Sequence, residues 1–483
     1  MELIKKYIPY LLLAIGFYAL SVPLWLKIDE LPLRLWDESR NAVSAIEMYE
    51  SEDWIVRTVD YQADDWDLKP PLLTWFQVVS LHLFGLNELG IRFPSFLFSM
   101  GSLLVLFALV YRMTQNRWVA FLASTITATS AGFYGDHVAR FGDHDALLIF
   151  LICCTLYSVY QYASTRQNKF IYTSALFVML GILAKSIAIG MTIPGMAFWL
   201  LWDKKFLQLL KNKHFYIALV LALLPIVAYY YSREQLQPGY LNLVWELELF
   251  PRFFNSSSTL TFKKYDYWYY AKLLCHNQMK YWIWGCLLFL IVPILQKKKN
   301  SGFSFWLFQV FTFFFIISSG TKNFWYVAPV IPMIAGGIAI SVHLIISANR
   351  KHLYWLTAPI LCLAALSYSK AYNYSFYPAE KPYQWETNGI SHFLKDPSHL
   401  KNVTSNTQIL LDHLRGYEPH KFYLKALKLE KDLYLKRTEL YYLKPYDTLL
   451  ISHKITYDKL VQLYDVQVLD SSYSHTKLLT IKP

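Results

Sequence analysis

The stretch WDESRNAVSAIEMYESEDWI occupies residues 36–55 and follows directly on the first long apolar segment of the chain. Asp37 and Arg40 stand at its start, where that apolar segment ends. After them, Ala42 and Ile46 share one face of a helix, while the glutamates fall on other faces. This pattern is typical of an amphipathic helix that lies on a bilayer. The charges at its start either cap the helix, as Asp often does, or belong to a site.

Composition places the chain among membrane proteins. Of its 483 residues, 55% are hydrophobic and only 17% are charged, whereas soluble domains carry about 25% charged residues. The 37 Tyr and 16 Trp suit the two membrane–water interfaces. The net charge of +12 could suit nucleic acid, but the basic residues fall between apolar segments, so we expect no such partner. The five Cys are scattered and show neither a disulfide framework nor zinc spacing.

Apolar segments of membrane-spanning length recur along the chain. A bilayer requires roughly 20 apolar residues per helix, and about eleven segments come near this length. We therefore predict an α-helical polytopic membrane protein with about 11 transmembrane helices and up to about 13, the count being most open at 170–202. The predicted spans are 7–26, 94–111, 118–134, 146–163, 170–184, 187–202, 215–231, 281–295, 303–319, 324–346 and 353–369.

The connections between these spans predict an orientation. If the N-terminus is cytoplasmic, each of the five inner connections is net basic, which is the positive-inside pattern. They read RMTQNR, STRQNK, DKKFLQLLKNKH, QKKKN and ANRKH. Acidic residues concentrate in the outer pieces, which are 27–93, 135–145, 232–280, 320–323 and the tail after about residue 370. We expect a multi-pass protein of the cytoplasmic (inner) membrane whose C-terminal part is extracytoplasmic.

The tail differs in kind from the rest of the chain. KPYDTLLISHKITYDKLVQLYDVQVLD predicts strand, helix and strand, and HTKLLTIK predicts another strand, because short apolar runs alternate with turn residues. A small α/β domain is therefore expected there. The predicted domains are 1–370, a transmembrane domain with outer juxtamembrane helices within 27–93 and 232–280, and 371–483, the extracytoplasmic α/β domain.

A second surface helix is predicted by LKPPLLTWFQVVSLHLFG, residues 68–85. Pro70 and Pro71 oppose a helix before them and suit the start of a helix after them. This helix and the one after Asp37 would frame Asp37 and Lys69 at the outer surface of the membrane.

Ionisable residues gather at the outer ends of spans that are far apart in the sequence. HVARFGDHDALLIF carries Arg140, Asp143 and Asp145, LAKSIAIG carries Lys185, and SSGTKNFWYVAPVIPMIAGG carries Lys322 before Trp325 and Tyr326. Ionisable groups at membrane depth are costly and tend to be functional, although near a span end a long side chain can also reach water harmlessly. We favour one outer cavity with two carboxylates and several cations over a chance scatter.

Such a set of groups suits one kind of chemistry. Cations at a bilayer surface can bind a phosphate head group, and a carboxylate can take a proton from an attacking hydroxyl. Together they describe sugar transfer from a lipid phosphate, which leaves as an anion held by Lys and Arg. The alternative is a flippase or transporter of a lipid-linked anion, for which half-repeats and broken mid-membrane helices are expected. A structural assembly protein would leave the carboxylates unexplained.

Five motifs carry a resemblance to a known family. WDESR, LKPPLLTWFQ, LFGLNELGIRFPS, ARFGDHDALL and TKNFWYVAPVIP resemble, in order and spacing, the motifs of the bacterial glycosyltransferases that include the lipid A aminoarabinose transferase. That family is related to the dolichyl-phosphate-mannose protein mannosyltransferases. The resemblance covers about the first 340 residues and is most specific from Trp36 to Ser95. It implies the C-type glycosyltransferase membrane fold and a polyprenyl-phosphate sugar donor used at the outer face.

The resemblance also implies roles for individual residues. Asp37 matches the catalytic acidic residue of the first outer loop, and Arg40 the arginine three residues later. Lys69, before the Pro pair, matches a donor-phosphate ligand. Asp145 matches the second acidic position, and Lys322 the Thr-Lys motif before the Trp-Tyr pair.

The chain departs from the aminoarabinose transferases at two places. They read Phe-Glu-Lys-Pro where this chain has Asp67, Leu68, Lys69 and Pro70, and they carry a His where KKYDYWYY stands here. In those relatives the Glu and the His can hold zinc, so we predict no metal and no required cofactor here. The changes also leave the aminoarabinose donor and the lipid A acceptor open. The aromatic run 265–270 either stacks on sugar or belongs to the interfacial belt.

The interpretation is an integral membrane glycosyltransferase, expected to be inverting, that moves a pentose or hexose from a polyprenyl-phosphate donor. The acceptor would be a lipid A-like glycolipid, a glycan or a protein, and membrane lipids are the other expected partners. The predicted site has catalytic Asp37 and Asp145, donor-phosphate ligands Arg40, Lys69, Arg140 and Lys322, and supporting Asp143, Lys185 and Tyr326.

Overall fold

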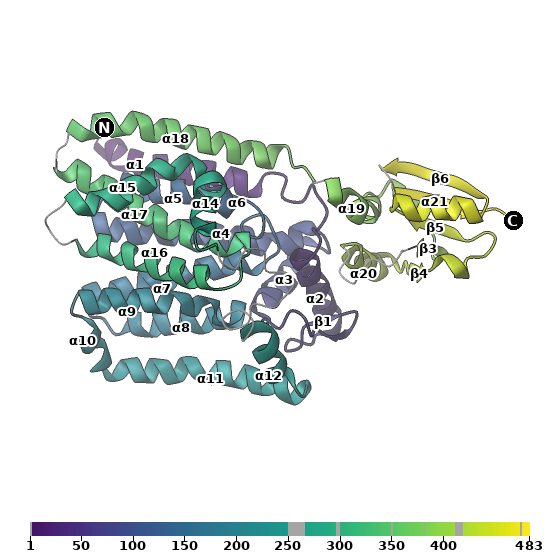
Figure 1. Cartoon of the computed structure of the whole chain (residues 1–483), viewed down its shortest axis with the longest axis horizontal. Helices are drawn as coiled ribbons and strands as arrows, with labels where there is room; N and C mark the ends of the chain where they lie inside the picture. The colour runs from purple at the N-terminus through teal and green to yellow at the C-terminus, as the bar shows by residue number, and fades with distance from the viewer. Residues whose placement is uncertain are drawn as a thin grey trace. The chain divides into compact units, whose positions relative to one another are not determined.

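The computed structural model describes residues 2–249, 266–295, 300–348, 351–380, 382–410, 419–473 and 476–483. The chain forms two compact units, which we describe one at a time (Figure 1). Unit 1 consists of Met1–Leu26, Asp64–Leu73 and Pro94–Phe376, and unit 2 of Lys27–Ala63, Thr74–Phe93 and Tyr377–Pro483. The division into domains 1–370 and 371–483 stays a prediction.

Unit 1 is built from helices that run side by side (Figure 1). Its long helices are α1 (Glu2–Trp25), α4 (Glu88–Thr114, which begins in unit 2), α7 (His144–Thr165), α8 (Lys169–Lys185), α11 (Lys213–Leu236), α16 (Ser301–Ser319), α17 (Val330–Ala348) and α18 (Lys351–Phe376). Its shorter helices are α5 (Arg117–Ala128), α6 (Ala131–Tyr134), η1 (Ser186–Thr192), α9 (Ile193–Trp202), α10 (Phe206–Leu210), α12 (Tyr240–Leu243), η2 (Val244–Leu249), α14 (Tyr269–Leu273), η3 (Leu274–Gln278), η4 (Lys280–Trp282), α15 (Ile283–Leu295) and η5 (Phe324–Val327).

Seven helical segments within the described residues are long and apolar enough to cross a membrane. They are Tyr7–Trp25, Glu88–Thr114, His144–Thr165, Lys169–Trp202, Lys213–Leu236, Ser301–Ser319 and Phe324–Ala348. The predicted class, a helical polytopic membrane protein, is thereby confirmed. The finer count of about eleven stays a prediction, because the spans expected at 118–134 and 281–295 coincide with short or broken helices, and 170–202 is interrupted by η1.

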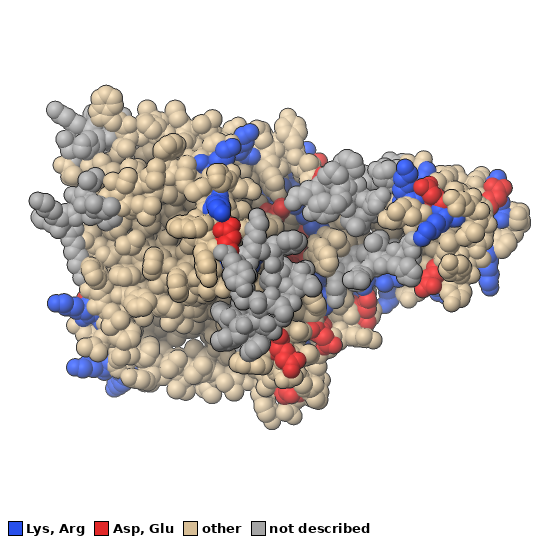
Figure 2. Space-filling view, in the orientation of Figure 1, with Lys and Arg blue, Asp and Glu red and all other residues tan. Residues whose placement is uncertain are grey.

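Asparagines begin several of these helices at the basic connections. The side chain of Asn116 accepts from the backbone N–H groups of Trp118 and Val119, and Asn212 and Asn300 cap α11 and α16 in the same way. Such caps satisfy backbone donors that the first helical turn leaves unpaired. Figure 2 shows that the surface over α8, α9 and α11 carries almost no charge, with basic residues near α10 and acidic residues towards the other end of α11.

Helix α17 is the buried centre of unit 1. Every residue from Val330 to Val342 is buried, and two glycines let bulky rings approach its backbone. A Cβ atom on Gly336 would lie 2.5 Å from the ring of Trp306, and one on Gly337 would lie 2.4 Å from the ring of Phe289. Small residues at helix contacts are typical of membrane proteins, in which helices associate by close packing.

Unit 2 combines part of the predicted first outer loop with the C-terminal tail. From the loop come α2 (Asp37–Ser51), the antiparallel pair β1 (Thr58–Val59) and β2 (Gln62–Ala63), and most of α3 (Leu72–Phe84). From the tail come α19 (Pro382–Lys395), η6 (His399–Asn402), β3 (Thr407–Leu410), α20 (His420–Lys431), β4 (Lys436–Thr438), η7 (Leu440–Tyr442), β5 (Thr448–Ile451), α21 (Lys454–Leu463), β6 (Val466–Tyr473) and β7 (Thr476–Ile481).

The tail forms a mixed five-stranded sheet in the order β4-β3-β5-β7-β6. β3 pairs in parallel with β4 and β5, while β7 pairs antiparallel with β5 and β6. Leu450 of β5 lies opposite Ile409 and Leu478, and all three are buried in the core of unit 2. The predicted strand, helix and strand at 444–470 and the final strand are confirmed.

Helix α2 forms where it was expected, but it is buried on all of its faces between Glu38 and Met48. Every side chain from Glu38 to Met48 is buried, including the faces that the sequence pattern left polar. Its apolar residues Val43 and Ile46 join a core that also contains Phe393 and Phe422 of the tail. The expectation of an amphipathic helix with an open polar face is therefore wrong, because the tail covers faces that the local sequence pattern assigned to water.

Candidate active site

The N-terminal end of α7 is fixed by Asp143. Its Oδ1 accepts from the backbone N–H of His144 at 2.6 Å and caps the helix, and its Oδ2 lies 2.6 Å from Nδ1 of His137. Burial raises the pKa of the Asp143 carboxyl, but the hydrogen bond and charge of His137, together with the charges of Lys185 and His144, leave that pKa below its ordinary value. The ring of His137 stacks on Trp325, with centroids 4.0 Å apart. Asp143, predicted as a supporting residue, thus orients an imidazole.

Asp145 and Lys185 form a buried ion pair. Asp145 lies in the first turn of α7 and Lys185 at the end of α8, and Oδ2 and Nζ are 2.6 Å apart. The next residue, Ser186, has φ of 51°, a left-handed conformation that ends α8 and starts η1. Both charged groups are buried, so each one offsets the desolvation penalty of the other. Removal of either residue would leave an unpaired buried charge and destabilise the fold.

The loop that carries Lys69 is held by short-range and long-range contacts. Oδ1 of Asp64 accepts from the N–H groups of Trp66 and Asp67 at 2.9 and 3.0 Å, which forms a local Asx turn. Nζ of Lys69 then donates to Oδ1 of Asp67 at 2.6 Å. The other oxygen of Asp67 lies 3.9 Å from Nε2 of His144 on α7. Because His144 directly precedes Asp145, this approach brings the Lys69–Asp67 pair close to the turn of α7 that carries the Asp145–Lys185 pair.

The remaining predicted cations of unit 1 lie in different surroundings. Nζ of Lys322 donates to the carbonyl oxygens of Ser318 and Gly320, and among the described residues no carboxylate forms an ion pair with it. Burial lowers the pKa of Lys322, and the charge of Asp266 offsets part of that effect. Arg140 donates to the carbonyl of Pro23 at 3.1 Å and does not line the pocket described next.

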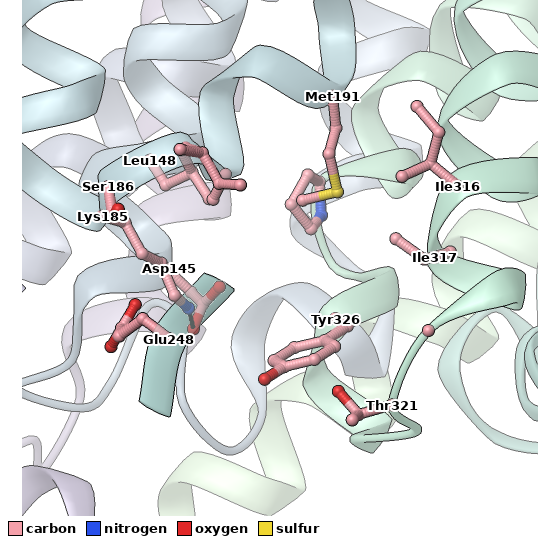
Figure 3. A pocket seen from close by; sticks show the side chains of 14 residues that line it. Asp145, Leu148, Lys185, Ser186, Met191, Glu248, Ile316, Ile317, Thr321 and Tyr326 are labelled. Carbon is pink, nitrogen blue, oxygen red and sulfur yellow. Dashed lines mark hydrogen bonds and ion pairs between the residues drawn. The ribbon is translucent and has the colours of Figure 1, made fainter. Parts of the chain in front are cut away.

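A pocket with about 710 Å³ of empty space, part of it open to solvent, lies within unit 1. Asp145, Lys185 and Tyr326, which the sequence predicted, line it together with Glu248 and Thr321. Figure 3 shows Glu248, Thr321 and Tyr326 on one side of the pocket, and the apolar side chains of Leu148, Met191 and Ile316 on the other. The pocket therefore offers polar groups at one side and a hydrocarbon surface at the other.

Asp37 and Arg40 belong to unit 2 and lie in the first turn of α2. The residue before Asp37, Trp36, has φ of 77° and ψ of −119°, which is a strained conformation for a bulky side chain. Arg40 is buried, and its backbone N–H donates to the carbonyl of Trp36 at 3.0 Å. The structure thus places Asp37 as the first helical residue of α2, after Trp36 in the N-cap position.

Four functional candidates were missed by the sequence interpretation. Asp67 and His144 stand beside predicted residues, but only their contacts reveal them. His137 could have been suspected from its place six residues before Asp143. Glu248 lies in the predicted outer piece 232–280, where the sequence gives no signal that it reaches the pocket.

The residues that could hold a metal are few within unit 1. His137 and Asp143 offer one imidazole and one carboxylate as possible metal ligands within this unit. Residues 263–265, the start of KKYDYWYY, lie outside the described residues. The absence of a required metal therefore stays a prediction.

Comparison with known sequences agrees with the motifs. Residues 68–231 match a family described as dolichyl-phosphate-mannose-protein mannosyltransferase. An uncharacterized protein of Aquifex aeolicus is 27% identical over 54% of this chain and 55% of its own length. The undecaprenyl phosphate-alpha-4-amino-4-deoxy-L-arabinose arabinosyl transferase of Erwinia tasmaniensis is 26% identical over 62% of this chain and 52% of its own length. The chain thus matches about half the length of these curated relatives.

Comparison with solved structures identifies the fold. The crystal structure of ArnT from Cupriavidus metallidurans bound to undecaprenyl phosphate superposes with a TM-score of 0.68 at 14% identity, covering 97% of both chains. The apo form of the same protein matches with the same TM-score over 99% of this chain. The chain therefore has a C-type glycosyltransferase-like fold, and its predicted resemblance to the aminoarabinose transferases and protein mannosyltransferases is confirmed.

Proposed function

We propose that this chain is an integral membrane glycosyltransferase that moves a sugar from a polyprenyl-phosphate donor to an acceptor at the outer face of the cytoplasmic membrane. The observation that carries the proposal is the two-sided pocket of unit 1, in which an ion pair and further polar groups face an apolar wall. A lipid phosphate has the same two parts, a charged head and a hydrocarbon chain. The matched family and the ArnT-like fold support this assignment.

Three lysines of unit 1, Lys69, Lys185 and Lys322, are the proposed ligands of the donor phosphate. An ammonium group has three donors, so Lys69 and Lys185 can each keep one hydrogen bond to Asp67 or Asp145 and turn the others to phosphate oxygens. Among the described residues, Lys322 contacts carbonyl oxygens and the ring of Tyr270 and forms no ion pair with a carboxylate. A leaving phosphate gains negative charge during transfer, and fixed cations stabilise that charge.

Asp37 is the proposed base for the acceptor. A carboxylate within reach of the acceptor hydroxyl would take its proton as the hydroxyl attacks the anomeric carbon, and the sugar–phosphate bond would break on the opposite side with inversion. Arg40 and Arg140 are proposed phosphate-side cations, Asp145 orients Lys185, and Asp143 and Tyr326 support the site. Where the acceptor is itself a phosphate, no base is needed and Asp37 positions the acceptor instead.

The decisive experiment uses purified protein in liposomes with a polyprenyl-phosphate sugar carrying a labelled sugar. Lipid, glycan and protein fractions of the cell envelope serve as acceptors, and mass spectrometry of the envelope of a deletion strain identifies the natural product. We expect label to pass to one acceptor fraction with release of polyprenyl phosphate. If the labelled donor crosses the bilayer intact and no product forms, the chain is a flippase and the transferase proposal fails.

A further inference from the structure

Helix α20 of the tail packs directly on α2 of the first outer loop, and both belong to unit 2 (Figure 1). Phe422 and Ala426 of α20 share one buried core with Val43 and Ile46 of α2. The tail therefore contributes to the core around the helix that begins with Asp37.

Three lysines on one side of α20 bind the outer loop. They stand four and three residues apart, so they share a helix face. Their ion pairs are Lys421–Asp60 at 2.7 Å, Lys425–Glu47 at 2.9 Å and Lys428–Glu50 at 2.8 Å. Lys425 also lies over the ring of Tyr61, 3.7 Å from its centroid. The loop partners of these lysines come from both α2 and the β1–β2 pair, so the contacts fix the register of α20 on the loop.

Tyr423 extends this contact to the residues just before Asp37. Its hydroxyl accepts from the backbone N–H of Leu33 at 2.9 Å and donates to Oε1 of Glu88 at 2.6 Å. Burial, together with the neighbouring Glu88 carboxylate, holds the pKa of Tyr423 well above its ordinary value, so the hydroxyl keeps its proton for this bond. Lys395 of α19 binds the carbonyls of Asp29 and Glu30 as well as Glu88.

The segment held in this way ends in a strained residue. Trp36 adopts φ of 77°, which a bulky residue rarely adopts, and it directly precedes Asp37. Strain of this kind persists only where surrounding contacts enforce it. The contacts of Tyr423 and Lys395 lie within eight residues of Trp36 and are of the kind that enforces such a conformation.

We propose that the C-terminal tail, through α20, positions the segment that carries Asp37, so that Tyr423 is a positioning residue for transfer and the tail is a working part of the enzyme. This inference rests on the proposed function, because it assumes that Asp37 acts in sugar transfer. According to this inference, the tail acts in catalysis by positioning Asp37 and does not serve as an independent binding domain.

The first test changes one hydroxyl. Tyr423→Phe keeps the ring in the core but removes the bonds to Leu33 and Glu88, so hydrogen exchange at the Leu33 amide should accelerate in the full-length protein. A displaced catalytic group slows the reaction, so turnover should fall about 10-fold to 100-fold while the donor concentration for half-maximal rate stays unchanged. In an Asp37→Asn background the same change should cost no further turnover.

The second test asks whether α20 rests on α2 in the active enzyme. Glu50→Lys and Lys428→Glu each place like charges together and should each lower turnover, and the double variant should restore it because the pair is reversed. Lys482→Glu is the matched control, since Lys482 pairs at 3.1 Å with Asp465 inside the tail and both are well exposed. Its turnover and its exchange at Leu33 should equal those of the wild type.

The outcomes separate this inference from the proposed function. If wild-type protein transfers sugar but Tyr423→Phe leaves turnover and Leu33 exchange unchanged, the positioning role is refuted and the transferase assignment stands. An equal loss in the Asp37→Asn background, or no recovery in the charge-reversed double variant, also refutes it. If wild-type protein transfers no sugar while Tyr423→Phe accelerates Leu33 exchange, the function is wrong and only the structural contact remains.

Discussion

Arg92 binds the carboxylate of Glu38 with two nitrogens, Nε to Oε1 at 2.7 Å and Nη2 to Oε2 at 2.9 Å. Its other N–H groups donate to three backbone carbonyls within residues 28–32 at 2.7–2.8 Å. Both side chains are buried, and all five donors of the guanidinium are used. One arginine therefore fixes the segment that leads into Asp37.

Removing this arginine should destabilise unit 2. Arg92→Ala leaves Glu38 buried without its cation, which costs about 3–5 kcal/mol of the free energy of unfolding. Arg92→Lys should recover only part, because an ammonium cannot form the two-pronged contact. Denaturant unfolding in detergent measures the change, and exposed Arg437→Ala should stay within about 0.5 kcal/mol of the wild type. An Arg92→Ala protein as stable as that control would contradict the assignment.

The Asp145–Lys185 pair should separate stability from activity. Lys185→Met leaves a buried carboxylate unpaired and should lower stability by about 3–5 kcal/mol. The double variant Asp145→Asn/Lys185→Met should regain most of the stability, because the buried charges are gone, yet remain inactive. Thermal unfolding and sugar transfer are measured side by side. Recovery of transfer along with stability would show that the pair is structural only.

Lys69 should matter to donor binding, whereas Lys27 should not. Lys69→Ala should weaken binding of polyprenyl phosphate and slow transfer, and Lys69→Arg should recover part of both. The control Lys27→Ala removes a half-exposed lysine that pairs with Glu30 at 2.9 Å, and such a pair contributes little. Binding to protein in nanodiscs and turnover are the measurements. If Lys69→Ala and Lys27→Ala have equally small effects on donor binding and turnover, Lys69 is not part of the donor site.

Unit 2 should lose stability in acid through His420. This residue is buried, and burial, with the charges of Arg437 and Lys421, lowers its pKa to about 3. Between its ordinary pKa of about 6.5 and that value, the unfolded state binds a proton that the folded state does not. Stability should therefore be complete above about pH 6.5 and fall as the pH decreases below it.

The measurement compares melting temperatures at pH 7.5 and 5 for the wild type and His420→Gln. The variant lacks the titrating group, so its melting temperature should fall less between the two pH values. A parallel fall in both proteins would show that His420 is not the source of the acid sensitivity. The paired carboxylates Asp60 and Glu50 would not account for it either, because their pKa values lie below the ordinary 3.8 and 4.5 and they stay ionised at pH 5.

Cysteine labelling tests the orientation. In a variant without the five native cysteines, Tyr441→Cys lies in the tail at a side chain that is 86% exposed. Gln167→Cys lies in the predicted inner connection STRQNK and is also exposed. An impermeant reagent should label position 441 on intact cells and position 167 only after permeabilisation. The reverse result would place the proposed site on the cytoplasmic side.

The sequence by itself determined the features that depend on neighbouring residues. Apolar length set the helices, as in His144–Thr165 and Ser301–Ser319, and asparagine caps and the pair Pro70–Pro71 set where helices begin. The alternation in the tail set β5, α21, β6 and β7. These signals are legible because backbone hydrogen bonding, capping and the proline ring act within a few residues.

Only the tertiary structure decided which charges meet. Asp145 pairs with Lys185, 40 residues away, and Tyr423 reaches Leu33, 390 residues away. The sequence marked Asp145 and Lys185 as unusual but named no partner, and it gave no sign of Tyr423 or Glu248. A buried charge or hydroxyl must find a partner because water is excluded, yet any carboxylate or amide of the chain could serve. The packing of helices that are distant in the sequence determines which partner is used, and no local sequence pattern predicts it.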